Sequence, residues 1–424
     1  MGACDLGDRP PFLLGAMVGA DPFAWHDLQP SAQLATISDV VGDLARRGFG
    51  AVWVTGFDGH NADLPLIPVW LEAAERHCLR VVVEGSGGPF AIHKTSNANA
   101  AATLAHARAE VIPTWRGIAR QWGRHPNLLA YCPVEEIGDN VEAGESPTLS
   151  ALAEVGRAVA EEDPVHPVTT IHVASWVSVA AAEARMRGPN LKALVADVYP
   201  FMASSDWTAT ASDPRLSWRT PDEQTRGYLT WMGRHADIAR AAGVPFWVFA
   251  QAFSGTWYRR IAEKVESRPL FVMPDLARMR FQIWAAALLG ARGVFLFVYQ
   301  STGPFPEDVL STLEEWEYDV GMRTTGGQAT EALQGATLVA RRMAPLLPLL
   351  GRVQVEGAIV EDGPVLARGA TDPVSQRRYV LLLNRDVEAE HAVPPALVAR
   401  FGLAARGTLA PGDGDLVELP AAGR

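Results

Sequence analysis

Residues 278–299, RMRFQIWAAALLGARGVFLFVY, contain the pattern that decides the fold. A long apolar segment with helical spacing ends near Gly290, and a short run of aromatic and β-branched residues follows it. Glycine just past the last helical turn lets the chain reverse toward a strand. The stretch therefore predicts a helix that leads into a buried strand, as in a parallel α/β sheet.

The same alternation occurs along most of the chain. Eight predicted strands follow helical segments: FLLGAMVG (12–19), GAVWVTGF (50–57), LRVVVEG (79–85), LLAYCPVEE (128–136), PVTTIHVA (167–174), LKALVADVY (191–199), PFWVFAQAF (245–253) and RGVFLFVY (292–299). An eightfold repeat favours a closed (β/α)₈ TIM barrel over an open doubly wound sheet, whose G-x-G-x-x-G fingerprint is missing after the first strand. We therefore expect an α/β protein with a (β/α)₈ barrel over residues 1–350.

After Gly351 the sequence pattern changes to short stretches in which apolar and polar residues alternate, separated by Gly, Pro and Asp. This pattern is typical of antiparallel strands and predicts a small β-sandwich accessory domain over residues 351–424. Three longer insertions follow predicted strands, at 139–148, 202–225 and 254–270. We expect all three to be loops at the mouth of the barrel, at the carboxyl ends of its strands. TIM-barrel enzymes have their active sites at this end.

Composition excludes several classes of function. The 424 residues carry a formal net charge of −11, which disfavours a nucleic-acid partner. The G-x-S-x-G elbow of serine hydrolases is absent, and so is the P-loop, and we expect no cofactor. His60 and His172 are too isolated in the sequence to predict a metal site.

No window of about 18 apolar residues predicts a membrane span, and no signal peptide is visible. We expect a cytoplasmic chain, although a secreted form that has lost its leader fits the same residues. The sequence gives no indication of the oligomeric state.

Polar residues at the strand ends are the candidates for chemistry, because the barrel interior is packed and only its rim is open. Four of them are carboxylates: Glu84, Glu135, Glu136 and Asp197. Crowded carboxylates have separated pKa values, which lets an acid and a base coexist as glycoside hydrolysis requires. Any single rim carboxylate can equally be a solvated or salt-bridged group.

Further residues predicted at the mouth fit substrate binding. The polar and tyrosine candidates are His60, His172, Tyr199, Gln251 and Tyr299. Trp25, Trp176, Trp207 and Trp257 fall in predicted mouth loops, where indole rings stack on sugars or simply anchor the loops. A carbohydrate is therefore the expected partner.

The run HPNLLAYCPVEEIGDN (125–140) resembles the fourth strand of clan A glycoside hydrolases, which delivers the acid/base glutamate. The likeness extends to ADVYPF (196–201) as sixth strand, to PFWVFAQAF as seventh, and to residues 278–299 as the last helix and strand. The resemblance implies a TIM-barrel glycosidase with Glu136 as general acid.

Two residues depart from that family's pattern. Glu135 replaces the usual Asn before the acid/base, and Gln251 stands where the seventh strand carries the nucleophile. An amide is a poor nucleophile and no general base, so another group has to fill that role.

Either Asp197 or Glu84 acts as nucleophile or base, or Glu135 orients a substrate acetamido group with help from Tyr199, similar to chitinases and hexosaminidases. A catalytically inactive barrel that binds carbohydrate is the alternative.

Overall fold

The computed structural model describes residues 12–19, 30–57, 66–92, 100–134, 147–173, 183, 186, 191–203, 218–261, 264–301, 314–404 and 407–420. The described chain divides into two compact units. Unit 1 comprises the described parts of Leu13–Asp197 and Arg234–Val248, and unit 2 those of Val198–Gly233 and Phe249–Arg424.

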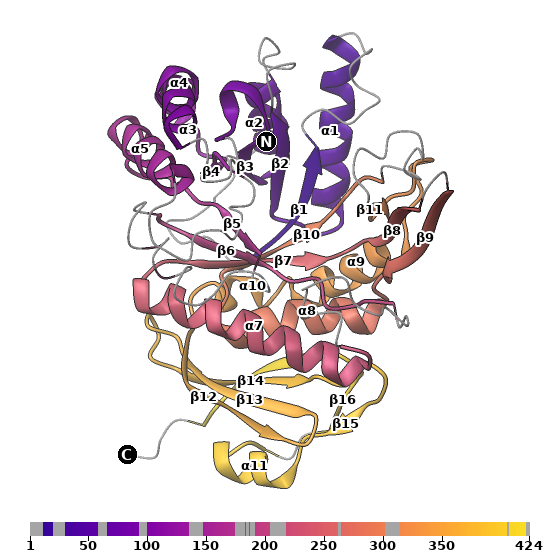
Figure 1. The fold of residues 1–424 in the computed structure, drawn as a ribbon. Coiled ribbons are helices and arrows are strands. Elements are labelled where there is room, and N and C mark those ends of the chain that lie inside the picture. The colour runs from indigo at the N-terminus through magenta and orange to yellow at the C-terminus, as the bar shows by residue number, and fades with distance from the viewer. Residues whose placement is uncertain are drawn as a thin grey trace. The chain divides into compact units, whose positions relative to one another are not determined.

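Eight strands form one sheet in the order β4-β3-β2-β1-β10-β7-β6-β5 (Figure 1). They are β1 Leu13–Gly19, β2 Ala51–Phe57, β3 Arg80–Gly85, β4 Leu128–Cys132, β5 Ile171–Val173, β6 Leu194–Asp197, β7 Phe246–Gln251 and β10 Gly293–Phe297. Each lies within one of the eight predicted strands. Tyr131 at one end of this order also bridges in parallel to Val168, just before β5. The sheet is thus a nearly closed barrel, which confirms the predicted fold class.

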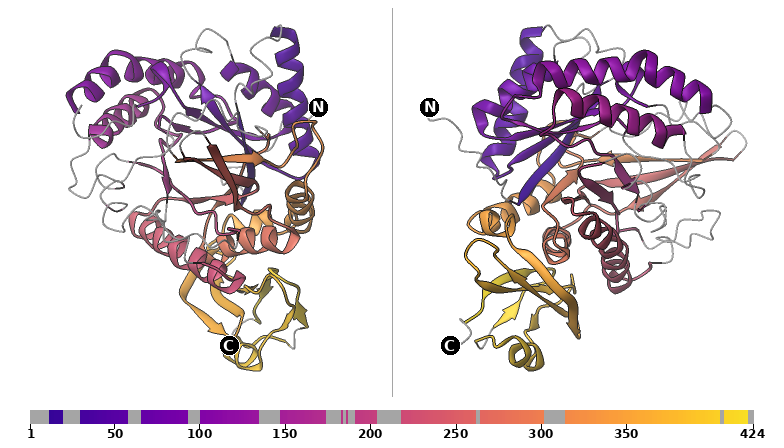
Figure 2. Two further views of the ribbon diagram at one scale, coloured as in Figure 1. Left: turned by 45° about the vertical axis from the view of Figure 1, so that its right-hand side comes forward. Right: turned by 90° about the vertical axis from the view of Figure 1, so that its left-hand side faces the viewer.

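Helices of unit 1 lie along the outside of its strands (Figures 1 and 2). They are α1 Pro30–Arg46, α2 Leu66–His77, α3 Ala100–His106, α4 Ile112–Trp122 and α5 Pro147–Glu162, with a short 3₁₀ turn at Gly88–Phe90 and a π turn at Ala107–Val111. In α1 the fully buried Ile37, Val41 and Leu44 recur at helical spacing, so one stripe of the helix packs inward.

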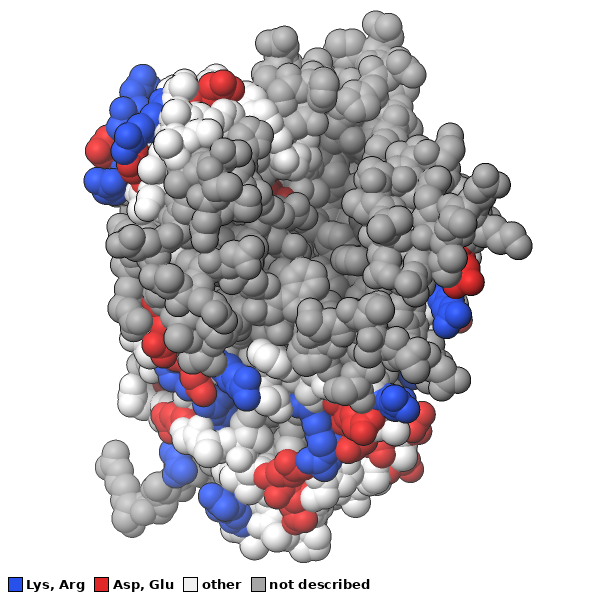
Figure 3. All heavy atoms as spheres, in the orientation of Figure 1, with Lys and Arg blue, Asp and Glu red and all other residues white. Residues whose placement is uncertain are grey.

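The outer surfaces of α4 and α5 carry paired charges (Figure 3). Arg116 pairs with Glu161, and Arg120 lies 2.6 Å from Glu162. Such exposed pairs contribute little stability, but they place opposite charges of neighbouring helices next to each other.

Unit 2 contains an antiparallel sheet of three strands in the order β11-β8-β9. Its strands are β8 Ser254–Ile261, β9 Lys264–Phe271 and β11 Glu314–Val320. Residues 254–270 were expected as a mouth loop, and the structure instead forms a β-hairpin there. The third strand, β11, begins more than 40 residues after the hairpin ends, which local sequence patterns do not reveal.

The C-terminal region of unit 2 is built from antiparallel sheets, as predicted for the β-sandwich. Four strands pair in the order β12-β13-β14-β17, and β15 pairs with β16. Their bounds are β12 Gln354–Asp362, β13 Val365–Thr371, β14 Arg378–Asn384, β15 His391–Ala392, β16 Thr408–Leu409 and β17 Gly414–Glu418. The neighbouring helices are α7 Pro221–Ala242, α8 Leu276–Leu289, α9 Glu331–Met343, α10 Leu347–Leu350 and α11 Pro395–Phe401. Helix α8 contacts both β14 and β17.

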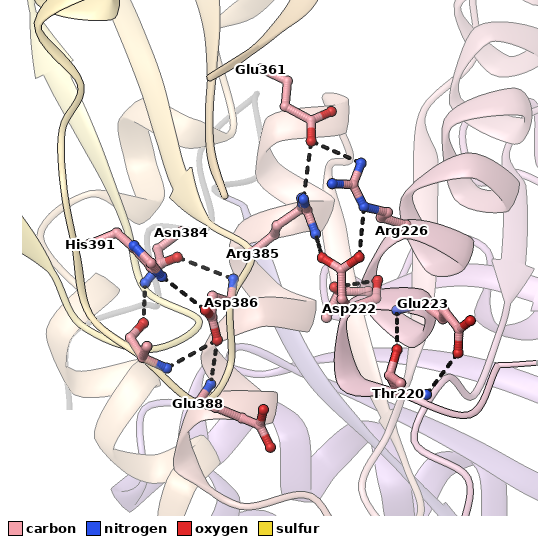
Figure 4. A network of polar contacts seen from close by, with 12 residues as sticks. Thr220, Asp222, Glu223, Arg226, Glu361, Asn384, Arg385, Asp386, Glu388 and His391 are labelled. Carbon is pink, nitrogen blue, oxygen red and sulfur yellow. Dashed lines mark hydrogen bonds and ion pairs between the residues drawn. The ribbon is translucent and has the colours of Figure 1, made fainter. Parts of the chain in front are cut away.

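A closed ring of charges joins α7 to two strands of this C-terminal region (Figure 4). Arg226 lies 2.9 Å from Asp222 and 3.0 Å from Glu361. Arg385, which directly follows β14 and is 4% exposed, contacts the same two carboxylates. Hydrogen bonding from Arg385 and from Arg226 lowers the pKa of Asp222, although burial opposes the shift.

Among the described residues, no helix is both long and apolar enough to cross a bilayer.

Candidate active site

Strand register shows that Glu84 faces the interior of the barrel. Glu84 on β3 is the partner of Cys132 on β4, so their side chains share one face of the sheet. Tyr131 therefore points to the other face, where its ring meets Trp115 of α4 edge-on, with centroids 5.9 Å apart. Because α4 covers the outside of the sheet, Glu84 and Cys132 point inward.

Two side chains of β2 hold the Glu84 carboxylate. Its Oε2 accepts a hydrogen bond from the indole Nε1 of Trp53, and its Oε1 accepts one from the hydroxyl of Thr55. Glu84 and Trp53 are both 0% exposed. Burying an ionised carboxylate is costly, and hydrogen bonds to its oxygens offset part of that cost. The arrangement therefore suits a carboxylate that is fixed in one orientation.

The backbone that leads into Glu135 and Glu136 is also fixed. The carbonyl oxygen of Val134 accepts hydrogen bonds from the Cys132 thiol at 3.2 Å and from the Thr170 hydroxyl at 3.0 Å. The Ile92 N–H donates to the carbonyl of Pro133 at 3.1 Å. The end of β4 is thus tied both to the segment after β3 and to the segment before β5.

Asp197 and His172 lie on opposite faces of neighbouring strands. Asp197 on β6 is the register partner of Val173, one residue after His172. The His172 ring packs edge-on against His235 of α7, with centroids 6.2 Å apart. His172 is therefore turned toward the helix layer and is fully buried, whereas the 3% exposed Asp197 is turned toward the interior. Of the two, only Asp197 shares with Glu84 the face that lines the barrel.

Gln251, in unit 2, is held by the backbone on every side of its amide. Its Oε1 accepts from Phe201 N–H at 2.9 Å, and its Nε2 donates to the carbonyls of Phe201 at 3.1 Å and Val272 at 2.8 Å. The Gln282 side chain bonds both the N–H and the carbonyl of Gln251, at 2.7 and 2.9 Å. With 0% exposure, Gln251 braces the segments that follow β6 and β9.

Tyr199 belongs to an aromatic cluster of unit 2. Its ring stacks on Phe297 at 5.6 Å between centroids and meets Phe253 edge-on at 5.0 Å. Tyr199 is 7% exposed, so most of its surface serves packing.

Tyr299 follows β10 and is linked to a cation. Arg323 Nε donates to the Tyr299 hydroxyl at 2.7 Å, and the guanidinium of Arg323 also bonds the carbonyl of Gly327. The sequence interpretation did not include Arg323, because it lies in a segment after β11 with no motif around it.

Two groups with shifted pKa values, Tyr131 and Asp163, lie away from these strand ends. Tyr131 donates to Asp163 at 2.6 Å, and His166 Nδ1 lies 2.8 Å from the same oxygen. Burial and the Asp163 hydrogen bond raise the pKa of Tyr131. Burial raises the pKa of Asp163, but the hydrogen bonds from Tyr131 and His166 outweigh it, so that pKa is lowered. Asp163 directly follows α5 and precedes β5, at the opposite end of the barrel from the predicted mouth.

Several predicted site residues lie outside the described part of the chain. These are Glu135, Glu136, His60, Trp25, Trp176 and Trp207. Trp257 is described only by its backbone in β8, where it is the register partner of Trp316. Within the described ranges, no group of three or more His, Cys, Asp or Glu side chains could hold a metal ion.

Trp53 and Thr55 are the site residues that sequence reasoning missed. Both lie in the predicted second strand, two residues apart, so they share a face. Their link to Glu84 depends on the pairing between β2 and β3. A polar residue in an otherwise apolar strand, as in AVWVTGF (51–57), was the available signal.

Comparison with known proteins gives information about the fold. No family model matches the sequence, and no curated protein matches it. Among solved structures, an endo-β-1,4-mannanase from Thermotoga petrophila aligns over 98% of this chain and 99% of its own, with a TM-score of 0.53 and 10% identity.

Two larger enzymes align with the same fold. A β-galactosidase from Marinomonas ef1 has a TM-score of 0.52 and 13% identity, over 80% of this chain and 60% of that protein. A β-glucuronidase from Ruminococcus gnavus has a TM-score of 0.50 and 12% identity, over 78% of this chain and 50% of its own. This chain thus spans between half and two thirds of the length of these two. At such identities the likeness concerns the fold, and these fold neighbours are glycoside hydrolases.

Proposed function

We propose that this chain is a glycoside hydrolase in which Glu136 is the general acid. The observation that carries the proposal is the inward-facing pair of carboxylates, Glu84 and Asp197, at the carboxyl ends of β3 and β6 in a barrel shared with glycosidases. Glycoside hydrolysis needs a proton donor and a second carboxylate, and Glu136 comes two residues after Val134, whose carbonyl is fixed by the Thr170 hydroxyl.

The second carboxylate is Glu84 or Asp197, or else Glu135 assists by orienting a substrate acetamido group, with Tyr199 in a supporting role. A carboxyl separation of about 5–5.5 Å from Glu136 would correspond to retention of configuration, and about 6.5–9.5 Å to inversion. Residues 1–350 form the catalytic domain in this proposal, and residues 351–424 the accessory domain.

A panel of aryl glycosides that includes N-acetylhexosaminides tests the proposal. The wild-type chain should release aglycone from at least one member, and Glu136→Gln should lower that rate by about 10²–10⁴-fold. Equal rates for the wild type and Glu136→Gln on a confirmed substrate would remove Glu136 as the acid.

The alternative is a catalytically inactive barrel that binds carbohydrate, and the contacts of Gln251 favour it. Its amide is engaged with backbone groups where the related strand carries a nucleophile, so this position supplies no nucleophile. The alternative predicts saturable binding of a glycan in calorimetry without any turnover of the panel. Turnover that Glu136→Gln abolishes would exclude it.

A further inference from the structure

The Glu84 carboxylate is held by donors that stand on a rigid element. Trp53 and Thr55 both project from β2 on the inward face, and β2 pairs with β1 on one side and β3 on the other. The Trp53 side chain is fully buried, so its indole N–H is fixed in direction. A carboxylate between two such donors has little freedom to rotate.

Both donors favour the charged form of Glu84. An ionised carboxylate accepts hydrogen bonds at both oxygens, whereas a protonated one has to present an O–H at one of them. With Oε1 and Oε2 each accepting from a neighbour, the carboxylate matches its surroundings better than the acid does. Asp197 also points inward, as its register with Val173 shows.

We propose that Trp53 and Thr55 are positioning residues that hold Glu84 as a carboxylate, and that Glu84 is the second carboxylate of the reaction in which Glu136 is the acid. This inference rests on the proposed glycosidase function. Either Glu84 takes a proton from water as the water oxygen bonds to the anomeric carbon, or Glu84 bonds to that carbon and water later displaces it. In both courses the glycosidic C–O bond breaks, and the leaving oxygen takes a proton from Glu136.

Substitutions at Thr55 separate positioning from simple packing. Thr55→Val removes the donor and keeps the shape, whereas Thr55→Ser keeps the hydroxyl. Thr337→Val is the matched control, because the buried Thr337 hydroxyl donates to the Leu333 carbonyl within α9. Unfolding midpoints of all variants are measured alongside activity.

The expected result is specific to the loss of the donor. On the aryl glycoside that the wild type hydrolyses fastest, Thr55→Val should lower kcat by on the order of 10-fold or more. The acidic limb of its pH profile should move to higher pH, because the charged form of Glu84 has lost a donor. Thr55→Ser should restore both properties, Thr337→Val should match the wild type, and Trp53→Phe should behave like Thr55→Val. Glu84→Gln should lose about 10²-fold or more with good and poor leaving groups alike.

Contrary outcomes separate the two proposals. If Glu136→Gln is inactive while Glu84→Gln or Thr55→Val keeps the wild-type rate and pH profile, the inference fails and the glycosidase function stands. If the wild type hydrolyses no member of the panel, the function itself fails and the inference falls with it.

Discussion

The packing around Gln251 requires an amide side chain, because a carboxylate at this position could not donate hydrogen bonds to two carbonyl oxygens. Its Nε2 bonds the carbonyls of Phe201 and Val272 in a fully buried setting. We therefore expect Gln251→Glu to lower the free energy of unfolding by about 1–3 kcal/mol and to leave glycosidase activity no higher than wild type. Urea unfolding measures the first effect, and Gln334→Glu on the exposed side of α9 is the control. Unchanged stability together with a gain of activity would contradict the bracing role.

Asp163 should make stability depend on pH. The pKa of Asp163 is lowered in the folded chain despite burial, because Tyr131 and His166 donate to it. A lowered folded pKa means that the stabilisation is present above the unfolded value of about 3.9 and is lost as the pH falls through the folded value.

Asp163→Asn should accordingly cost about 1–3 kcal/mol at pH 7, and the gap to wild type should narrow below about pH 4. Urea titrations at several pH values measure this. A gap that stays constant from pH 7 to pH 3 would show that the charge of Asp163 contributes nothing.

Residue positions at strand ends were predictable, but the directions of side chains were not. Glu84 and Asp197 follow apolar runs, so their place at the ends of strands is legible in the sequence. In a parallel strand buried on both faces, however, the alternation that would show which side chains point inward disappears. For that reason His172 looked equivalent to Asp197, although it turns toward His235.

At the scale of elements, the eight barrel strands were predictable because each combines an apolar run with a preceding helix. The hairpin β8–β9 was not, since SGTWYRRIAEKVESRPL lacks apolar alternation and pairs with a distant strand, β11. Its pairing is held partly by Asp319, which accepts hydrogen bonds from the hydroxyls of Thr256 and Tyr258.

Helix α8 and strand β17 meet closely enough to require a glycine. A Cβ at Gly414 would lie 2.6 Å from Cδ2 of Trp284 and 2.7 Å from the carbonyl oxygen of Leu382. Gly414→Ala should therefore cost about 1–3 kcal/mol through overpacking. Thermal unfolding checks this against Gly407→Ala, where an added Cβ meets nothing within 4 Å. Equal midpoints for the two variants would refute the close packing of α8 on β17.

The charge ring should stabilise the attachment of β12 and β14 to α7 (Figure 4). Removing the buried Arg385 leaves Asp222 and Glu361 with one cation between them. Arg385→Met should lower the free energy of unfolding by about 1–3 kcal/mol, and the loss should shrink in about 1 M salt, where charges are screened.

The matched control for the ring is Arg377→Met, since the pair of Arg377 with Glu418 is exposed on both sides. Surface pairs of that kind contribute roughly 0–1 kcal/mol. If Arg385→Met and Arg377→Met lower the free energy of unfolding equally, the charge ring stabilises the fold no more than an exposed ion pair does.

At the scale of the whole molecule, the fold and the proposed function are supported by different observations. The barrel is shared with a mannanase over nearly the full length of both chains, yet at 10% identity. Function therefore rests on what this chain's own side chains do, since one barrel fold hosts many activities. The proposal of hydrolysis rests on the carboxylates of β3 and β6 and on the fixed end of β4.

The most direct test compares leaving groups in Glu136→Gln. A general acid matters most when the departing oxygen needs a proton, so its removal should slow an alkyl glycoside by about 10²-fold or more while a dinitrophenyl glycoside of the same sugar loses far less. The measurement is kcat/KM for both substrates in wild type and variant. Equal losses on both substrates, or none on either, would contradict the assignment of Glu136 as the general acid.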